Sequence, residues 1–64
     1  MKELVDIWLT QMYDNEIDEV MKTISNERVW ELGFDGKGEN PHTRNIEILK
    51  AYVERLEILK EELE

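Results

Sequence analysis

The chain has 64 residues, so it forms one domain at most. Sixteen acidic residues against eight basic ones give a net charge of −8, which argues against binding to a nucleic-acid backbone or to an anionic membrane surface. There is no cysteine to form a disulfide or a thiolate metal site, and the single histidine cannot build a transition-metal site alone. We therefore predict no metal and no cofactor.

The composition also bears on the compartment in which the protein works. No stretch approaches the ~20 apolar residues of a membrane span. Acidic side chains stand near the start, where a secretion signal would carry its apolar run, so we expect no targeting peptide. A cysteine-free chain fits a reducing compartment, and we expect a cytoplasmic protein.

Residues 2–32 are predicted to be helical, with two apolar faces displaced by roughly 130° on a helical wheel. The first face consists of Leu4, Val5, Trp8, Leu9 and Met12, and the second of Tyr13, Ile17, Val20, Met21 and Ile24. The change falls at Asp14-Asn15, two residues of poor helix propensity. Either the helix bends there, or it runs on and its two ends face different neighbours.

A connector at residues 33–40 and a second helix at residues 41–63 complete the predicted order. Gly33 stands where a C-cap glycine is expected, and Asn40 followed by Pro41 is a favourable helix start. The apolar positions of the second helix cover an arc of roughly 160°, which is more than a seam against one helix needs. They are Ile46, Ile48, Leu49, Tyr52, Val53, Leu56, Leu59 and Leu63. This face is expected to touch two neighbours.

The predicted fold is all-α: residues 1–64 form a single helical domain, a hairpin that dimerises into a helical bundle. A chain this short buries only about 60% of its unfolded surface, and such scaffolds need a staple such as a partner chain. A first helix of about 46 Å would outreach a second of about 33 Å, which leaves the end near Trp8 uncovered. We expect the dimer interface to use Leu4, Trp8, Met12, Ile48, Tyr52 and Leu59.

Polar residues around the start of the second helix form the first candidate site. A helix N-terminus offers backbone N–H groups and a partial positive charge, which suit an anion. Arg28 continues the apolar stripe of the first helix, so it is expected to be partly buried and to need an acidic partner or a ligand. The predicted anion or nucleotide site consists of Arg28, Trp30, Asn40, His42, Thr43 and Arg44, with Trp30 stacking on a base. In the alternative interpretation, Asn40 and Thr43 cap the helix, Arg28 pairs with a glutamate and Trp30 closes the core.

Acidic residues form the second candidate site. Asp14, Glu16, Asp18 and Glu19 are clustered in the first helix, and we expect them to face a partner. The alternative is a solvated surface, since two carboxylates one turn apart lack a third metal ligand. Acidity is also expected at the far end of the second helix, from Glu54, Glu57, Glu61, Glu62 and Glu64. If the two acidic regions align across a dimer, they would imitate a phosphate backbone.

Catalytic groups are scarce in this sequence. Without cysteine, a nucleophile would have to be Ser25, a threonine or a carboxylate, and His42 has no serine–aspartate arrangement beside it. A short hairpin also offers little volume for a pocket that excludes water. We predict that the protein is not an enzyme.

Two stretches, NERVWELG at residues 26–33 and NPHTRNIEILKAYVERLEIL at residues 40–59, resemble small uncharacterised phage and prophage proteins built as helical hairpins. The shared features are a Trp-x-x-Gly helix ending, a polar His-x-x-Asn-Ile helix start and regular apolar spacing. The resemblance covers roughly residues 25–60, leaves the N-terminal segment unexplained and brings no catalytic residues. It implies an accessory phage product that blocks a host protein or captures a signalling nucleotide.

Three functions are compatible with these features. The first expectation is a small acidic, non-enzymatic binding protein that inhibits or modulates a host defence or regulatory protein in the host cytoplasm. Its partner is expected to be basic, and its contacts to come from acidic surfaces and exposed aromatic residues. The second is sequestration of a nucleotide or another phosphate-bearing signal at the start of the second helix. The third is a structural role in assembly.

Overall fold

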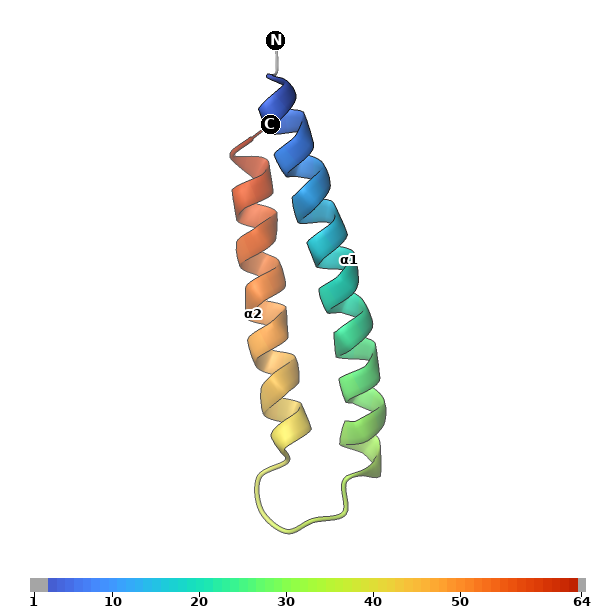
Figure 1. Cartoon of the computed structure of the whole chain (residues 1–64). Helices are drawn as coiled ribbons and strands as arrows, with labels where there is room; N and C mark the ends of the chain where they lie inside the picture. Colours follow the sequence, from blue (N-terminus) through green and yellow to red (C-terminus); the bar gives the residue numbers. More distant parts are fainter. Residues whose placement is uncertain (1–2, 64) are drawn as a thin grey trace.

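Two antiparallel helices make up the protein. The computed structural model describes residues 3–63, in which α1 (Leu4–Gly33) and α2 (Pro41–Glu61) are joined by residues 34–40. The start of α1 and the end of α2 lie at one end of the hairpin, and the connector lies at the other (Figure 1). The described residues contain no strand, which confirms the predicted all-α helical hairpin. The predicted helix start at residue 2 lies outside the described residues, and the helices end at Gly33 and Glu61 rather than at residues 32 and 63.

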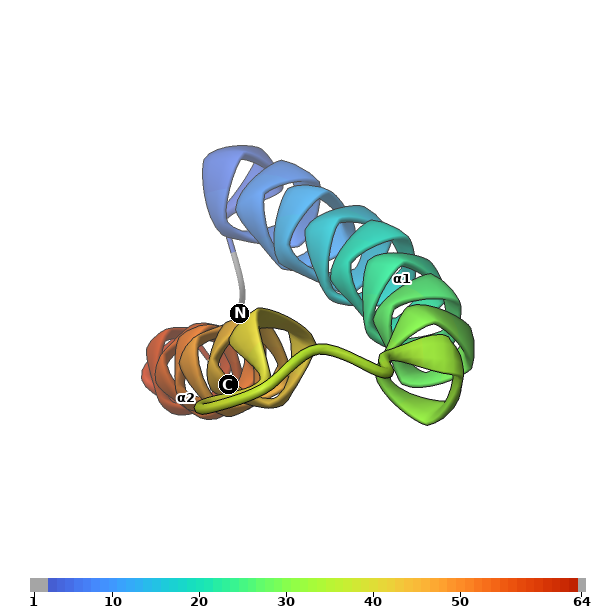
Figure 2. The ribbon, with the colours of Figure 1, turned by 90° about the horizontal axis from the view of Figure 1, so that it is seen from below.

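α1 runs without interruption through Asp14-Asn15, so the bent alternative does not occur. Asp and Asn each lower helix stability by only about 0.7 kcal/mol relative to alanine. Asp14 also forms an ion pair with Lys60 of α2 at 2.6 Å, which links this part of α1 to the other helix. Because the helix continues around one axis, its first turns face a different direction from the turns that pack on α2. Figure 2, a view along the hairpin, shows the two helices inclined to one another.

The core is one small apolar layer between the helices. Its buried members are Val20, Ile24, Ile46, Val53 and Leu56, and Ile17 and Leu49 pack against them. The predicted core face of α1 is therefore correct for three of its residues, but Met21 is exposed. Met21 follows Val20 directly and so lies about 100° further around the helix, away from α2.

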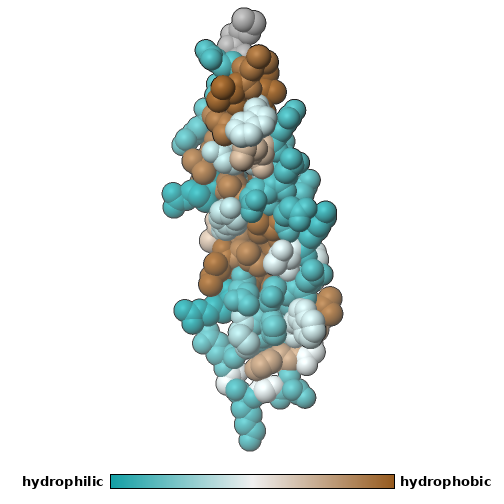
Figure 3. All heavy atoms as spheres, viewed as in Figure 1, coloured by the Kyte–Doolittle hydropathy of each residue, from teal (hydrophilic) through white to brown (hydrophobic). Residues whose placement is uncertain are grey.

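The first turns of α1 extend beyond the end of α2 (Figure 1). α1 has 30 residues and α2 has 21, which correspond to about 45 Å and about 32 Å. Leu4 is consequently 85% exposed and Trp8 59% exposed. Figure 3 shows hydrophobic residues gathered over this end of the molecule. In the part of the chain that is described, neither helix has an apolar stretch long enough to cross a bilayer.

Phe34 and two glycines shape the connector. Gly33 is not the C-cap predicted from the sequence: it is the last helical residue, and Phe34 follows it in an extended conformation. The Phe34 N–H donates to the Glu31 carbonyl at 3.3 Å, which ends the helix without a left-handed residue. The left-handed conformation occurs later, at Gly38, with a φ of 92°. Gly36 is overlain by the Phe34 ring, to which an added Cβ would come within 2.7 Å.

Candidate functional site: an acidic groove opposite an apolar flank

A network of side chains, the polar clamp, joins the helices at the connector end. It consists of Glu27, Glu31, Asn40, His42 and Thr43. Asn40 serves both helices: its Oδ1 accepts a hydrogen bond from the His42 backbone N–H at 2.9 Å, and its Nδ2 donates to the Glu31 carbonyl at 3.1 Å. The predicted N-cap is confirmed, and the same side chain ties the last turn of α1 to the first turn of α2.

Two carboxylates of α1 occupy the N-terminal end of α2. The Glu27 carboxylate lies 2.7 Å from His42 Nδ1, and Thr43 Oγ1 donates to the Glu31 carboxylate at 2.6 Å. The hydrogen bond from His42 lowers the pKa of Glu27 below its ordinary value, although partial desolvation opposes the shift. An ionised carboxylate only accepts, so His42 Nδ1 carries the hydrogen. The partial positive charge at the start of α2 also favours both carboxylates.

This geometry brings together only part of the predicted anion site. Its Asn40, His42 and Thr43 are bonded to carboxylates of the same chain or to the backbone, so an added phosphate would have to displace two negative groups. Arg28 is exposed and forms no salt bridge among the described residues, which corrects the expectation that it is partly buried. A step of four residues turns about 40° beyond a full helical turn, so Arg28 has rotated past the stripe. Arg44 is exposed as well, and the nucleotide site stays a prediction.

Trp30 covers His42 and does not close the core. It is 63% exposed, and its ring lies 6.3 Å from the His42 ring with an interplanar angle of 24°. Phe34 meets the same histidine edge-on at 6.4 Å. The surface predicted to stack on a base is thus turned toward a ring of the chain itself. Trp30 also lies about 200° around α1 from Arg28, so the two cannot close on one small ligand.

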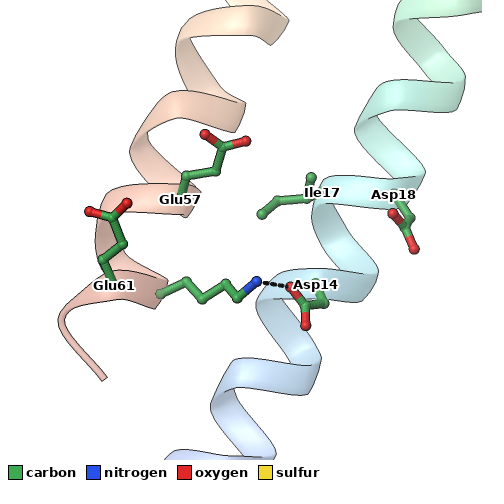
Figure 4. A pocket seen from close by; sticks show the side chains of 6 residues that line it. Asp14, Ile17, Asp18, Glu57 and Glu61 are labelled. Atoms are coloured by element: carbon green, nitrogen blue, oxygen red, sulfur yellow. Dashed lines mark ion pairs between the residues drawn. The ribbon is translucent and has the colours of Figure 1, made fainter. Parts of the chain in front are cut away.

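Toward the other end of the hairpin, an open groove of about 520 Å³ lies between the helices. It is lined by Asp14, Ile17, Asp18, Glu57, Lys60 and Glu61, and we call it the acidic groove. Figure 4 shows Glu57 and Glu61 on α2, the lysine side chain reaching across to Asp14 of α1, and Asp18 on the side of α1 turned away from α2. Four carboxylates against one ammonium leave three uncompensated negative charges among the lining residues.

The acidic cluster predicted in the first helix does not form one surface. Asp14 and Asp18 line the acidic groove, whereas Glu16 accepts a hydrogen bond from the Tyr52 hydroxyl at 3.4 Å on the other side of the hairpin. Residues two apart in sequence differ by about 200° around a helix, so acidic residues at every second position face opposite sides of it. Glu19 is exposed outside the groove. The acidic regions of the two helices meet within one chain in the acidic groove, which needs no dimer.

The side of the hairpin opposite the acidic groove carries a row of apolar residues, the apolar flank. It consists of Val5, Trp8, Met12, Ile48, Tyr52 and Leu59, of which only Leu59 is half-buried. On each helix these residues recur at spacings that place them on one side. The hydrogen bond between Tyr52 and Glu16, one turn after Met12, joins the two rows. Five of the six predicted interface residues lie here, and Leu4 lies beside them.

Tyr52 is the polar member of the apolar flank. Partial desolvation raises its pKa, and the neighbouring charge of Glu16 adds to the rise. The hydroxyl therefore remains a donor at neutral pH and keeps its bond to the carboxylate.

Sequence reasoning missed the roles of Glu27 and Glu31. Their signal was present, since two acids one turn apart stand on the last two turns of α1. In an antiparallel hairpin with a short connector, those turns lie beside the start of α2. Carboxylates there interact favourably with the partial positive charge at the start of α2. The sequence alone predicts an external anion at that position.

No protein-family model, curated protein or solved structure matches the chain. The resemblance of residues 25–60 to phage hairpin proteins therefore stays a prediction.

Proposed function

We propose that the protein is a small acidic, non-enzymatic binding protein that holds a basic segment of another protein in the acidic groove. In the setting implied by the resemblance to phage hairpin proteins, that partner is a host defence or regulatory protein of the cytoplasm. The chain inhibits or modulates the partner by covering its basic surface.

The ion pair inside the acidic groove is the observation that carries this proposal. Lys60 crosses from α2 and places its ammonium 2.6 Å from Asp14 of α1. The groove thus accommodates an alkylammonium group supplied by the chain itself. The remaining carboxylates, on Asp18, Glu57 and Glu61, are on both helices and within reach of further cations. A lysine or arginine of a partner supplies the positive charge that the lining residues lack.

The shape and composition of the groove favour a side chain over a free ion. Ile17 contributes an apolar surface between the acids, which suits the methylene stem of lysine or arginine. An arginine would also donate in parallel to paired carboxylate oxygens. The net charge of −8 attracts a basic surface from a distance and speeds the encounter.

A capture experiment with charge-matched variants tests the proposal. The groove variant, Asp18→Asn with Glu57→Gln, neutralises two acids of the acidic groove. The control variant, Asp35→Asn with Glu47→Gln, neutralises two exposed acids outside it. Both variants carry a net charge of −8 + 2 = −6. The immobilised natural chain and the control variant should retain the same basic protein from a host lysate, and the groove variant should lose it.

The other outcomes contradict the proposal in different ways. Equal retention by both variants would mean that overall charge, and not the groove, attracts the partner. If none of the three proteins retains anything, a structural role in assembly becomes the better explanation. Cross-linking of the captured protein to residues beside the groove gives an independent check on the contact.

A further inference from the structure

We infer that a second copy of this chain covers the apolar flank, so that two hairpins form a bundle with their acidic grooves on the outside. This inference goes beyond the binding of a basic segment and depends on the opposite side of the molecule.

The accessible surface of the chain is too large for a compact monomer. A folded monomer of 7.7 kDa exposes about 4300 Å², whereas this chain exposes 5288 Å². The excess of about 1000 Å² is comparable to the roughly 800 Å² that each partner buries in a standard protein interface. The radius of gyration is 15.4 Å, against about 11 Å for a compact chain of this length. A second hairpin packed against the first would bury an area of about this size.

The residues of the apolar flank are the kind that stabilise an interface. Trp8 and Tyr52 are large aromatic side chains, which are enriched where protein partners are held most tightly. Met12 and Ile48 add exposed apolar surface beside them. Exposed large apolar residues that gather on one side of both helices are typical of a contact surface.

The apolar flank suits a second copy better than a basic partner. The acidic side chains beside it already have partners in the chain: Glu16 accepts a hydrogen bond from Tyr52, and Glu19, seven residues after Met12, forms an ion pair with Lys22 at 3.5 Å. The flank also has two complementary parts: the turns with Trp8 extend beyond α2, while Ile48 lies exposed on α2 nearer the connector. A two-fold axis lets the extended turns of each copy pack along α2 of the other. The product is a four-helix bundle in which both ends of α1 are covered.

Charge gives this dimer a distinctive salt dependence. Each copy carries a net charge of −8, so two copies repel one another at low ionic strength. The screening length falls from about 30 Å at 0.01 M salt to about 8 Å at 0.15 M. Self-association should therefore strengthen as salt is added, whereas binding of a cation to the acidic groove should weaken.

Sedimentation equilibrium on a matched pair of variants tests the inference. Met12 lies in the apolar flank and Met21 lies outside it, yet both are methionines of α1 with similar exposure. The natural chain should sediment as a dimer at micromolar concentration. Met12→Glu should raise the dissociation constant at least about tenfold, as expected for a charge placed in an interface, and Met21→Glu should leave it nearly unchanged. Circular dichroism should show all three proteins equally helical.

A natural chain that sediments at 7.7 kDa throughout the micromolar range would overturn the inference, as would an equal effect of the two glutamates. The test is separate from that of the acidic groove. The groove variant should remain dimeric, and Met12→Glu should still retain the basic partner, so either idea can fail while the other stands.

Discussion

Replacement of Ile46 by alanine should destabilise the hairpin far more than the same replacement at Ile58. Both residues are isoleucines within α2, so the change in helix propensity is the same at each site. Ile46 is 4% exposed in the core, whereas Ile58 is 52% exposed on the outer side of the helix. The pair therefore isolates the effect of burial.

The expected magnitudes follow from the atoms removed. Ile→Ala deletes three carbon groups, each of which contributes about 0.8 kcal/mol when buried, or about 2.4 kcal/mol at Ile46. A cavity term adds to this loss unless the two helices close the gap. At Ile58, where only about half of the side chain is covered, we expect about 1 kcal/mol and no cavity. The difference, at least about 1.4 kcal/mol, is tenfold in the unfolding equilibrium and large against the roughly 3–10 kcal/mol available to a chain of this size.

Urea titration followed by far-UV circular dichroism measures both free energies of unfolding. All samples need the same protein concentration, because association with a second copy would add to the apparent stability. The midpoint should fall further for Ile46→Ala, with little change in the slope. Equal losses at the two positions would refute the assignment of Ile46 to the core, and with it the pairing of the two helices.

Three further changes probe the ends of the helices. Stability should fall as the pH drops below 4.5, because Glu27 has a lower pKa in the folded state than in the unfolded state and so binds fewer protons when folded. Glu27→Gln should flatten this dependence of stability on pH in acid titrations. An unchanged pH dependence would contradict the bond to His42. Asn40→Ala should destabilise the protein by about 1 kcal/mol through loss of the α2 cap, and a melting temperature that does not fall would count against that cap. Gly33→Ala should stabilise by about 0.5–1 kcal/mol because Gly33 is helical with open space around it, whereas Gly38→Ala should destabilise because its φ is 92°. Thermal melts that shift in the same direction for both glycines would contradict these conformations.

The hairpin itself could be predicted because its signals are local. The 3–4 spacing of Ile46, Leu49, Val53 and Leu56 marks the side of α2 that packs on α1, and Asn40-Pro41 marks its start. Neither signal depends on what the rest of the chain does. The same spacing rule identified the exposed side of α2, including the half of the apolar flank that belongs to it.

The features that escaped prediction depend on contacts between the helices. α1 continues through Asp14-Asn15 beside α2, and Asp14 forms an ion pair with Lys60, which belongs to that other helix. Four-residue steps from Ile24 predict a buried Arg28, but each step adds about 40° of rotation, and Arg28 is exposed. Glu27 finds His42 only once the connector has set the offset between the helices. Local propensity carries none of this information.

The acidic groove was predicted only in part for the same reason. The sequence marks Asp14 and Asp18 as acidic residues one turn apart, but Glu57 and Glu61 are only two of five glutamates near the end of the second helix. Their meeting in one groove follows from the antiparallel arrangement of α1 and α2, which composition does not contain. Glu16, from the same cluster, faces the opposite side of the hairpin.

The central functional claim is that the acidic groove, and not total charge, selects a basic segment. Fluorescence anisotropy of a labelled amphipathic peptide rich in lysine, titrated with the groove variant and with the control variant of equal net charge, tests this most directly. We predict binding about tenfold weaker for the groove variant, from two lost ion pairs of about 0.7 kcal/mol each, and weaker binding at higher salt for the control. Equal affinities for the two variants would contradict the claim.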